Sequence, residues 1–130
     1  MWGFTITLWA QSADKPATHQ HSAACTHKKI CTEPMPEAAF STELPAVSGA
    51  STASLMMSAA KRLAIANCLT TGQIREIMLQ FPDDQKRLIF AKFAYDNAWD
   101  PQNYQRVGEA LTTTGSKEEL GKFLESVKKP

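Results

Sequence analysis

The sequence predicts an all-α fold, a compact bundle of about five or six short helices preceded by a flexible tail. Three observations predict it. Apolar residues between positions 55 and 127 recur at spacings of three and four, several of these runs begin with a helix-capping residue, and none alternates as a strand does. The chain has 130 residues, of which 43% are hydrophobic, so one domain with one core is expected.

Residues 1–13 are predicted to be the remnant of a signal peptide. The first ten residues are mostly apolar, but this segment is too short for a membrane span, which needs about 20 residues. Small residues near Ala10 and Ala13 suit cleavage by a signal peptidase. A basic start is missing, and because Phe4, Ile6 and Leu8 alternate, a buried strand is the alternative. We therefore expect a secreted or periplasmic protein without a transmembrane span.

Residues 14–33 are predicted to form a flexible linker rich in His, Lys and Ser, and residues 34–130 the helical domain. Within the linker, His19, His21, Cys25 and His27 lie close together, and imidazole with thiolate is a plausible ligand set for zinc or copper. The spacing fits no standard site, and a linker offers no rigid support for the ligands. A solvated tail is therefore the alternative to a metal site.

Two apolar stripes predict the first helices of the domain. The first stripe consists of Phe40, Leu44 and Val47, and the second of Leu55, Met56, Ala59, Leu63 and Ala66.

The next helix is predicted to begin with a capping box, in which Thr70 caps the first turn and Gln73 reaches back to the amide of the cap. Its stripe is Ile74, Ile77, Met78 and Phe81.

Residues 86–99 are predicted to form the central helix. The segment is apolar nearly all round, and such a helix is stable only when other helices surround it. Full burial of a side chain such as Leu88 or Phe90 is worth about 1.5 to 3 kcal/mol, so this helix should supply a large share of the stability.

Two further helices complete the predicted bundle. Asp100 before Pro101 is expected to cap one of them, and a capping box from Ser116 to Glu119 is expected to begin the other. Their stripes are Tyr104, Val107 and Leu111 in the first, and Leu120, Phe123, Leu124 and Val127 in the second.

The sequence also contains a faint internal repeat, with offsets of 25 and 30 residues. Lys61-Arg62-Leu63 recurs as Lys86-Arg87-Leu88, and Thr70, Gln73, Ile74, Ile77 and Phe81 align with Asp100, Asn103, Tyr104, Val107 and Leu111. A duplicated helical hairpin would explain both matches. Chance similarity between helical stripes is the alternative.

Residues 67–104 contain a series of short motifs in a specific order. They are Asn67-Cys68-Leu69-Thr70, Gln73-Ile74, Ile77-Met78, Phe81, Lys86 to Leu88, Ala91-Lys92, Ala94-Tyr95, Asp100 and Asn103-Tyr104. With these motifs, residues 31–127 resemble the family known as domain of unknown function 4476. The resemblance implies a small helical domain, usually exported by bacteria and often appended to other envelope modules. It implies no reaction and no catalytic or binding residue.

The three cysteines, Cys25, Cys31 and Cys68, allow three single pairings. The family-like region contains Cys31 and Cys68, and this pair would tie the first segment of the domain to the end of the helix near Asn67. We therefore expect a Cys31–Cys68 disulfide, worth about 4 kcal/mol for a loop of this length, with Cys25 left free. The alternative is two buried thiols in a reducing compartment.

The sequence offers little for catalysis or for charge-driven binding. The histidines lie in the predicted linker, no nucleotide-binding or serine-hydrolase motif occurs, and a formal net charge of +1 gives little support for binding nucleic acid. The pairs Asp83/Asp84 and Glu118/Glu119 are expected in first turns of helices, where they complement the dipole. We expect a non-catalytic module, without a cofactor, that binds a protein or envelope component. The alternative is metal binding through the tail.

Overall fold

The computed structural model describes residues 31–128, and within this range it contains six α-helices and two 3-10 helices. They are α3 (Glu37–Glu43), α4 (Pro45–Ser48), α5 (Ala53–Ala66), α6 (Thr71–Met78), α7 (Asp84–Ala94), η2 (Tyr95–Asn97), η3 (Pro101–Ala110) and α8 (Thr114–Lys128). The predicted all-α bundle is confirmed. The predicted signal remnant and most of the predicted linker lie outside the described residues. No helix in the described range is both long and apolar enough to cross a bilayer.

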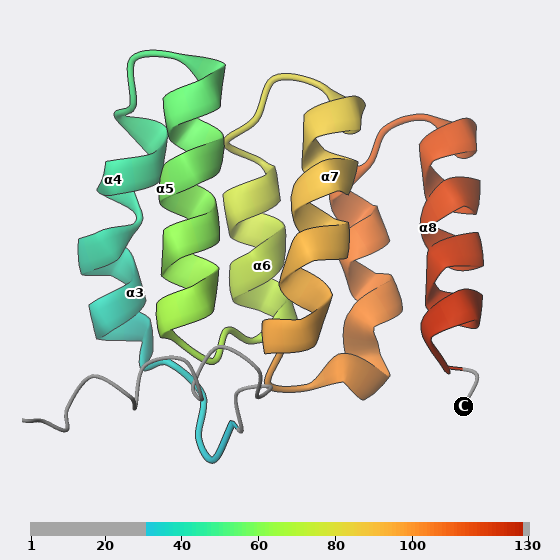
Figure 1. The fold of residues 1–130 in the computed structure, drawn as a ribbon, viewed down its shortest axis with the longest axis horizontal. Helices are drawn as coiled ribbons and strands as arrows, with labels where there is room; N and C mark the ends of the chain where they lie inside the picture. Colours follow the sequence, from blue (N-terminus) through green and yellow to red (C-terminus); the bar gives the residue numbers. More distant parts are fainter. Residues whose placement is uncertain (1–30, 129–130) are drawn as a thin grey trace, which may run out of the picture.

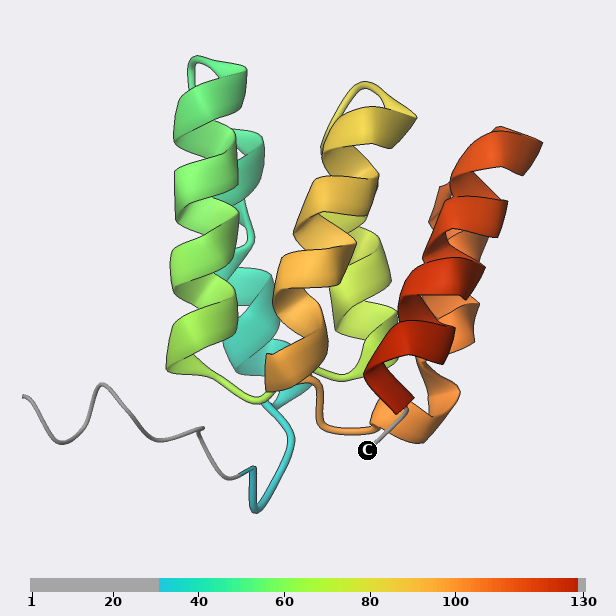
Figure 2. The same cartoon turned by 45° about the vertical axis from the view of Figure 1, so that its right-hand side comes forward.

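The helices form three successive hairpins arranged in two layers (Figures 1 and 2). The first hairpin joins α3 and α4 to α5, the second joins α6 to α7, and the third joins η3 to α8. Helices α5, α7 and α8 lie side by side in one layer, with α3/α4, α6 and η3 behind them in Figure 2. The first hairpin packs on the second mainly through α5 and α7, and the second packs on the third through both of its helices, α6 against η3 and α7 against α8.

The segments that lead into the three hairpins lie side by side at one end of the domain. The amide of Met35 donates to the carbonyl of Cys68 at 2.8 Å, and the amide of Trp99 donates to the carbonyl of Leu69 at 2.7 Å. Leu69 and Ala98 form an isolated parallel β-bridge. Backbone hydrogen bonds thus connect the start of each hairpin to the start of the next.

The internal sequence repeat corresponds to this arrangement. Residues 70–81 and 100–111 both span the first helix of a hairpin, whereas residues 61–63 and 86–88 both lie in a second helix. The matching segments therefore lie in corresponding helices of successive hairpins, although residues 61–63 lie further along α5 than residues 86–88 lie along α7. A common origin of these hairpins stays a prediction.

The buried stripe of α6 agrees with the sequence prediction, but the stripe of α5 differs from it. Ile74, Ile77, Met78 and Phe81 are fully buried. In α5, Ala59 and Leu63 are buried as predicted, but Leu55 is 54% exposed, Ala66 is exposed as well, and Ala60 and Ala64 are buried in addition. The prediction assumed one buried face, whereas α5 packs against α4 on one side and α7 on the other.

Two predicted elements near the N-terminus and the centre are shorter than expected. The stripe Phe40, Leu44 and Val47 spans two helices rather than one, since α3 ends before Pro45 begins α4. The central helix ends at Ala94 rather than Trp99, and a 3-10 turn follows. The Tyr104 hydroxyl donates to the Ala91 carbonyl at 2.5 Å, which satisfies an acceptor in the last turn of α7. The predicted central position of α7 is confirmed, because this helix contacts α5, α6, α8 and η3.

The predicted start of the last helix is also wrong. Helix α8 begins at Thr114, and the amide of Ser116 donates to the hydroxyl of Thr113 at 3.2 Å, so Thr113 is the cap. The predicted box from Ser116 to Glu119 therefore lies inside the helix, and the expected first-turn position of Glu118 and Glu119 is wrong, because the helix begins four residues before Glu118. Leu120 and Leu124 are buried as predicted, whereas Val127 is exposed.

Adjacent carboxylates at the start of α7 have different roles. Asp83 precedes the first turn in which it was expected and caps its own helix, accepting from the amide of Lys86 at 2.9 Å. Asp84 instead accepts from the amides of Thr112 (2.8 Å) and Thr113 (2.8 Å), and from both hydroxyls. Asp84 therefore connects the second hairpin to the turn of the third.

Replacing Asp84 with asparagine should make the domain less stable at neutral pH and less sensitive to acid. The amides of Thr112 and Thr113 hold the pKa of Asp84 well below its ordinary value. A depressed pKa adds stability above the unfolded-state value of about 3.9, and this stability is lost as the pH falls. Urea unfolding at several pH values should show the largest difference between wild type and Asp84→Asn near pH 7, narrowing below about pH 4. All other carboxylates are common to both proteins. A difference in the free energy of unfolding that stays constant as the pH falls would therefore contradict the prediction.

Candidate functional site

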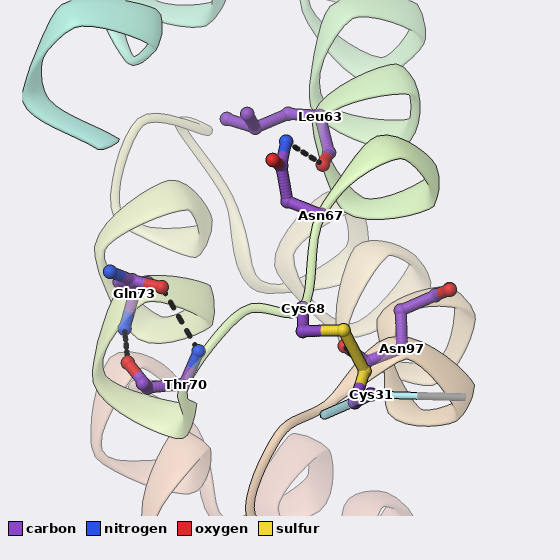
Figure 3. Close-up of a disulfide and its surroundings, with 7 residues drawn as sticks. All are labelled: Cys31, Leu63, Asn67, Cys68, Thr70, Gln73 and Asn97. Carbon is purple, nitrogen blue, oxygen red and sulfur yellow. Dashed lines mark hydrogen bonds between the residues drawn. A yellow bond between two sulfur atoms is a disulfide. The ribbon is translucent and has the colours of Figure 1, made fainter. Parts of the chain in front are cut away.

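A disulfide between Cys31 and Cys68 joins the segments that lead into the first and second hairpins (Figure 3). The two Cα atoms are 5.6 Å apart, and the bond closes a loop with a sequence separation of 37. The pair is the one that the family resemblance favoured. The Cys31 Sγ atom also lies 4.0 Å from the carbonyl oxygen of Asn97, in the segment that leads toward the third hairpin. The disulfide therefore sits where all three hairpins meet.

Next to the disulfide, Gln73 connects the second hairpin to the first. It forms the predicted capping box, in which the Thr70 amide donates to Gln73 Oε1 at 3.0 Å and the Gln73 amide donates to Thr70 Oγ1 at 3.1 Å (Figure 3). Its Nε2 group donates to the carbonyl of Met35 at 2.9 Å and to Glu37 at 3.2 Å. This buried amide therefore has a partner for both its oxygen and its nitrogen.

The role of Asp100 differs from the one predicted. Its side chain does not cap η3, a 3-10 helix rather than the expected α-helix. Oδ1 accepts from the amide of Thr71 at 2.8 Å and from its hydroxyl at 2.9 Å, while Oδ2 accepts from Asn103 at 3.0 Å. Asp100 thus satisfies a first-turn amide of α6, because the start of η3 lies beside the start of α6.

Residues 37–124 match the family described as Domain of unknown function (DUF4476). The chain belongs to this family. The matched region runs from the first residue of α3 into α8, so it includes all three hairpins. No curated protein and no solved structure matches the chain.

Several of the family-like polar residues in this DUF4476 domain lie at the junction of the hairpins. Thr70, Gln73, Asp100 and Asn103 all make side-chain hydrogen bonds there. The disulfide residue Cys68 and the bridging residue Leu69 lie in the same place. These contacts therefore hold the starts of the three hairpins together.

The predicted metal ligands His19, His21, Cys25 and His27 lie outside the described residues, so a metal site in the tail stays a prediction. Within residues 31–128, no three His, Cys, Asp or Glu side chains are grouped closely enough to hold a metal ion.

On the α5/α7/α8 layer, two surface hollows flank Ile89. One lies between α5 and α7, has a volume of about 430 Å³, and is lined by Ala53, Ser54, Met57, Ser58, Lys61, Lys86 and Ile89. The other lies between α7 and α8, has a volume of about 280 Å³, and includes Leu88 and Ile89 in its lining. Ile89 is 46% exposed, so this isoleucine forms an apolar ridge between two hollows. We call this region the Ile89 face.

The two hollows of the Ile89 face differ in charge. Among the described residues, the α5/α7 hollow is lined by two lysines and no carboxylate. The α7/α8 hollow contains one lysine and one glutamate, and these pair with each other, Lys92 Nζ lying 2.7 Å from Glu119 Oε2. Of these two hollows, only the α5/α7 hollow therefore contains a lysine, Lys61, that is not paired with a carboxylate among the described residues.

The sequence alone does not single out the Ile89 face, because Ile89 is one of many apolar residues in a helix expected to be surrounded by neighbours. The available signal was the run from Leu88 to Phe90, because three consecutive bulky apolar residues cannot all face the same side of one helix.

Proposed function

We propose that this DUF4476 domain is an extracytoplasmic, non-catalytic module that binds another protein through the Ile89 face. The observation that carries the proposal is the half-exposed isoleucine on the ridge between two hollows. Exposed apolar side chains beside concave surfaces are typical of sites where a partner supplies the missing packing.

The disulfide supports the extracytoplasmic part of the proposal. Disulfides form and persist in oxidising compartments and are rare where thiols are kept reduced. The apolar start of the chain, read as a signal remnant, points to the same compartment.

The polar junction supports a non-catalytic role. Gln73 and Asp100 make hydrogen bonds to neighbouring hairpins, so the family-like polar groups here have a structural use. The Tyr104 hydroxyl is likewise buried and donates to Ala91, and burial raises the pKa of this tyrosine.

Site-specific photo-crosslinking would test whether the Ile89 face binds a protein. A benzophenone side chain placed at position 89 in intact cells should give discrete cross-linked adducts. The matched control is position 79, because Leu79 is a similarly exposed apolar residue, at 50%, at the end of α6 in the other layer. Equal labelling at both positions, or none at position 89, would contradict the proposed function.

A further inference from the structure

We infer that the α5/α7 hollow binds an acidic amphipathic helix of a partner protein. This inference rests on the proposed function and specifies the chemistry of the partner at the Ile89 face. The apolar side chains of such a helix would enter the hollow, while its carboxylates would meet the lysines at the rim.

The shape of the hollow suits a helix. Its walls are α5 and α7, which lie side by side (Figure 2), and a third helix can pack in the groove between two others. Met57 and Ile89 supply apolar surface from the two walls. Ala53, Ser54 and Ser58 are small, so the partner's backbone can approach α5 closely. The volume of about 430 Å³ accommodates large apolar side chains.

The charge of the hollow selects the partner. Lys61 lies on α5 and Lys86 on α7, so each wall carries one ammonium group. Within residues 31–128, no carboxylate forms an ion pair with Lys61, whose Nζ lies 4.9 Å from the centre of the Phe93 ring. Lys86 forms an ion pair with Asp83 at 3.1 Å, so Lys61 supplies the uncompensated positive charge of the hollow. Carboxylates on a partner would complement this charge, whereas a basic helix would be repelled.

The neighbouring α7/α8 hollow is a weaker candidate for the same partner. Its Lys92 is paired with Glu119, and an incoming carboxylate would have to compete with that glutamate. An acidic helix should therefore lie over the α5/α7 side of Ile89.

Binding of designed peptides tests the inference. The probe is a fluorescently labelled helix of about five turns with leucines on one face and glutamates on the other, compared with a version carrying lysine in place of every glutamate. We expect the acidic peptide to bind the full chain and the basic peptide to bind at least about tenfold more weakly. Raising the salt from about 0.05 to 0.5 M should weaken binding of the acidic peptide.

Substitutions in the hollow should separate the apolar from the charged contribution. Ile89→Asp and Lys61→Glu should each weaken binding of the acidic peptide about tenfold or more. Leu79→Asp and Lys122→Glu are matched controls elsewhere on the surface and should leave binding unchanged. Thermal unfolding of each variant checks that the fold is retained.

Three outcomes would overturn the inference: no binding of the acidic peptide, equal binding of both peptides, or binding that Ile89→Asp and Lys61→Glu do not weaken. Vesicles of phosphatidylglycerol provide a further arm, because a protein that binds them through Lys61 and ignores the peptide recognises a membrane instead. Cross-links at position 89 together with failed peptide binding would leave the proposed function standing and refute only the acidic helix.

Discussion

Replacing Cys31 with serine, in a chain that already carries Cys25→Ser, should lower the free energy of unfolding by about 4 kcal/mol. The bond to Cys68 closes a loop with a sequence separation of 37, and breaking it restores the freedom of that loop in the unfolded chain. The Cys25→Ser background prevents Cys25 from pairing with the released Cys68. Urea unfolding followed by circular dichroism measures the change.

The control for this experiment is Cys25→Ser alone, which we expect to match wild type. Adding dithiothreitol to that protein should reproduce the loss seen with Cys31→Ser, whereas the double variant should not respond to the reductant. Equal unfolding midpoints with and without the disulfide would contradict this prediction. They would show that the hydrogen bonds of Met35 and Gln73 are enough to hold the first hairpin to the second.

Replacing Phe90 with alanine should cost about 3 to 5 kcal/mol, the other large effect that we expect. Phe90 is fully buried in α7, the helix that contacts both of its layer neighbours and the helices behind it, and its ring centre lies 6.2 Å from that of Phe81. Truncation would remove apolar contacts and leave a cavity in the core.

The neighbouring residue is a matched control for this substitution. Ile89→Ala changes the same helix by a similar chemistry, but because Ile89 is half-exposed it should cost at most about 1 kcal/mol. Since a domain of this size is stable by only about 5 to 15 kcal/mol, Phe90→Leu provides a milder variant that retains the fold. Equal losses at positions 89 and 90 would contradict the packing described for α7.

The second hairpin shows how far local sequence information reaches. Thr70 and Gln73 form a capping box between residues three positions apart, and the stripe of α6 repeats every turn, so the start and the buried face of this helix are both encoded locally. The α5 stripe was only partly right, because the residues that are buried depend on two neighbouring helices, α4 and α7, that no local pattern specifies.

The roles of the acidic residues depended even more on distant partners. Asp100 and Asp84 were both placed correctly at helix starts, yet each accepts hydrogen bonds from residues 28 or 29 positions away. A carboxylate at a helix start accepts hydrogen bonds from the backbone amides that lie near it. The stacking of the hairpins decides whether those amides belong to its own helix or to a neighbouring hairpin. The Ile89 face was missed for the same reason, because periodicity does not show which side of an apolar helix lacks a neighbour.

The sequence by itself determined that this protein is helical, where α6 begins, that α7 is central and, through its family-like motifs, which cysteines pair. Spacing and capping act within a few residues, so they can be recognised without the rest of the molecule. Only the tertiary structure decided that three hairpins stack in two layers, that Asp84 and Asp100 join neighbouring hairpins, and that Ile89 remains half-exposed. These features arise from contacts between residues far apart in the chain, and their energies depend on which surfaces the packing covers.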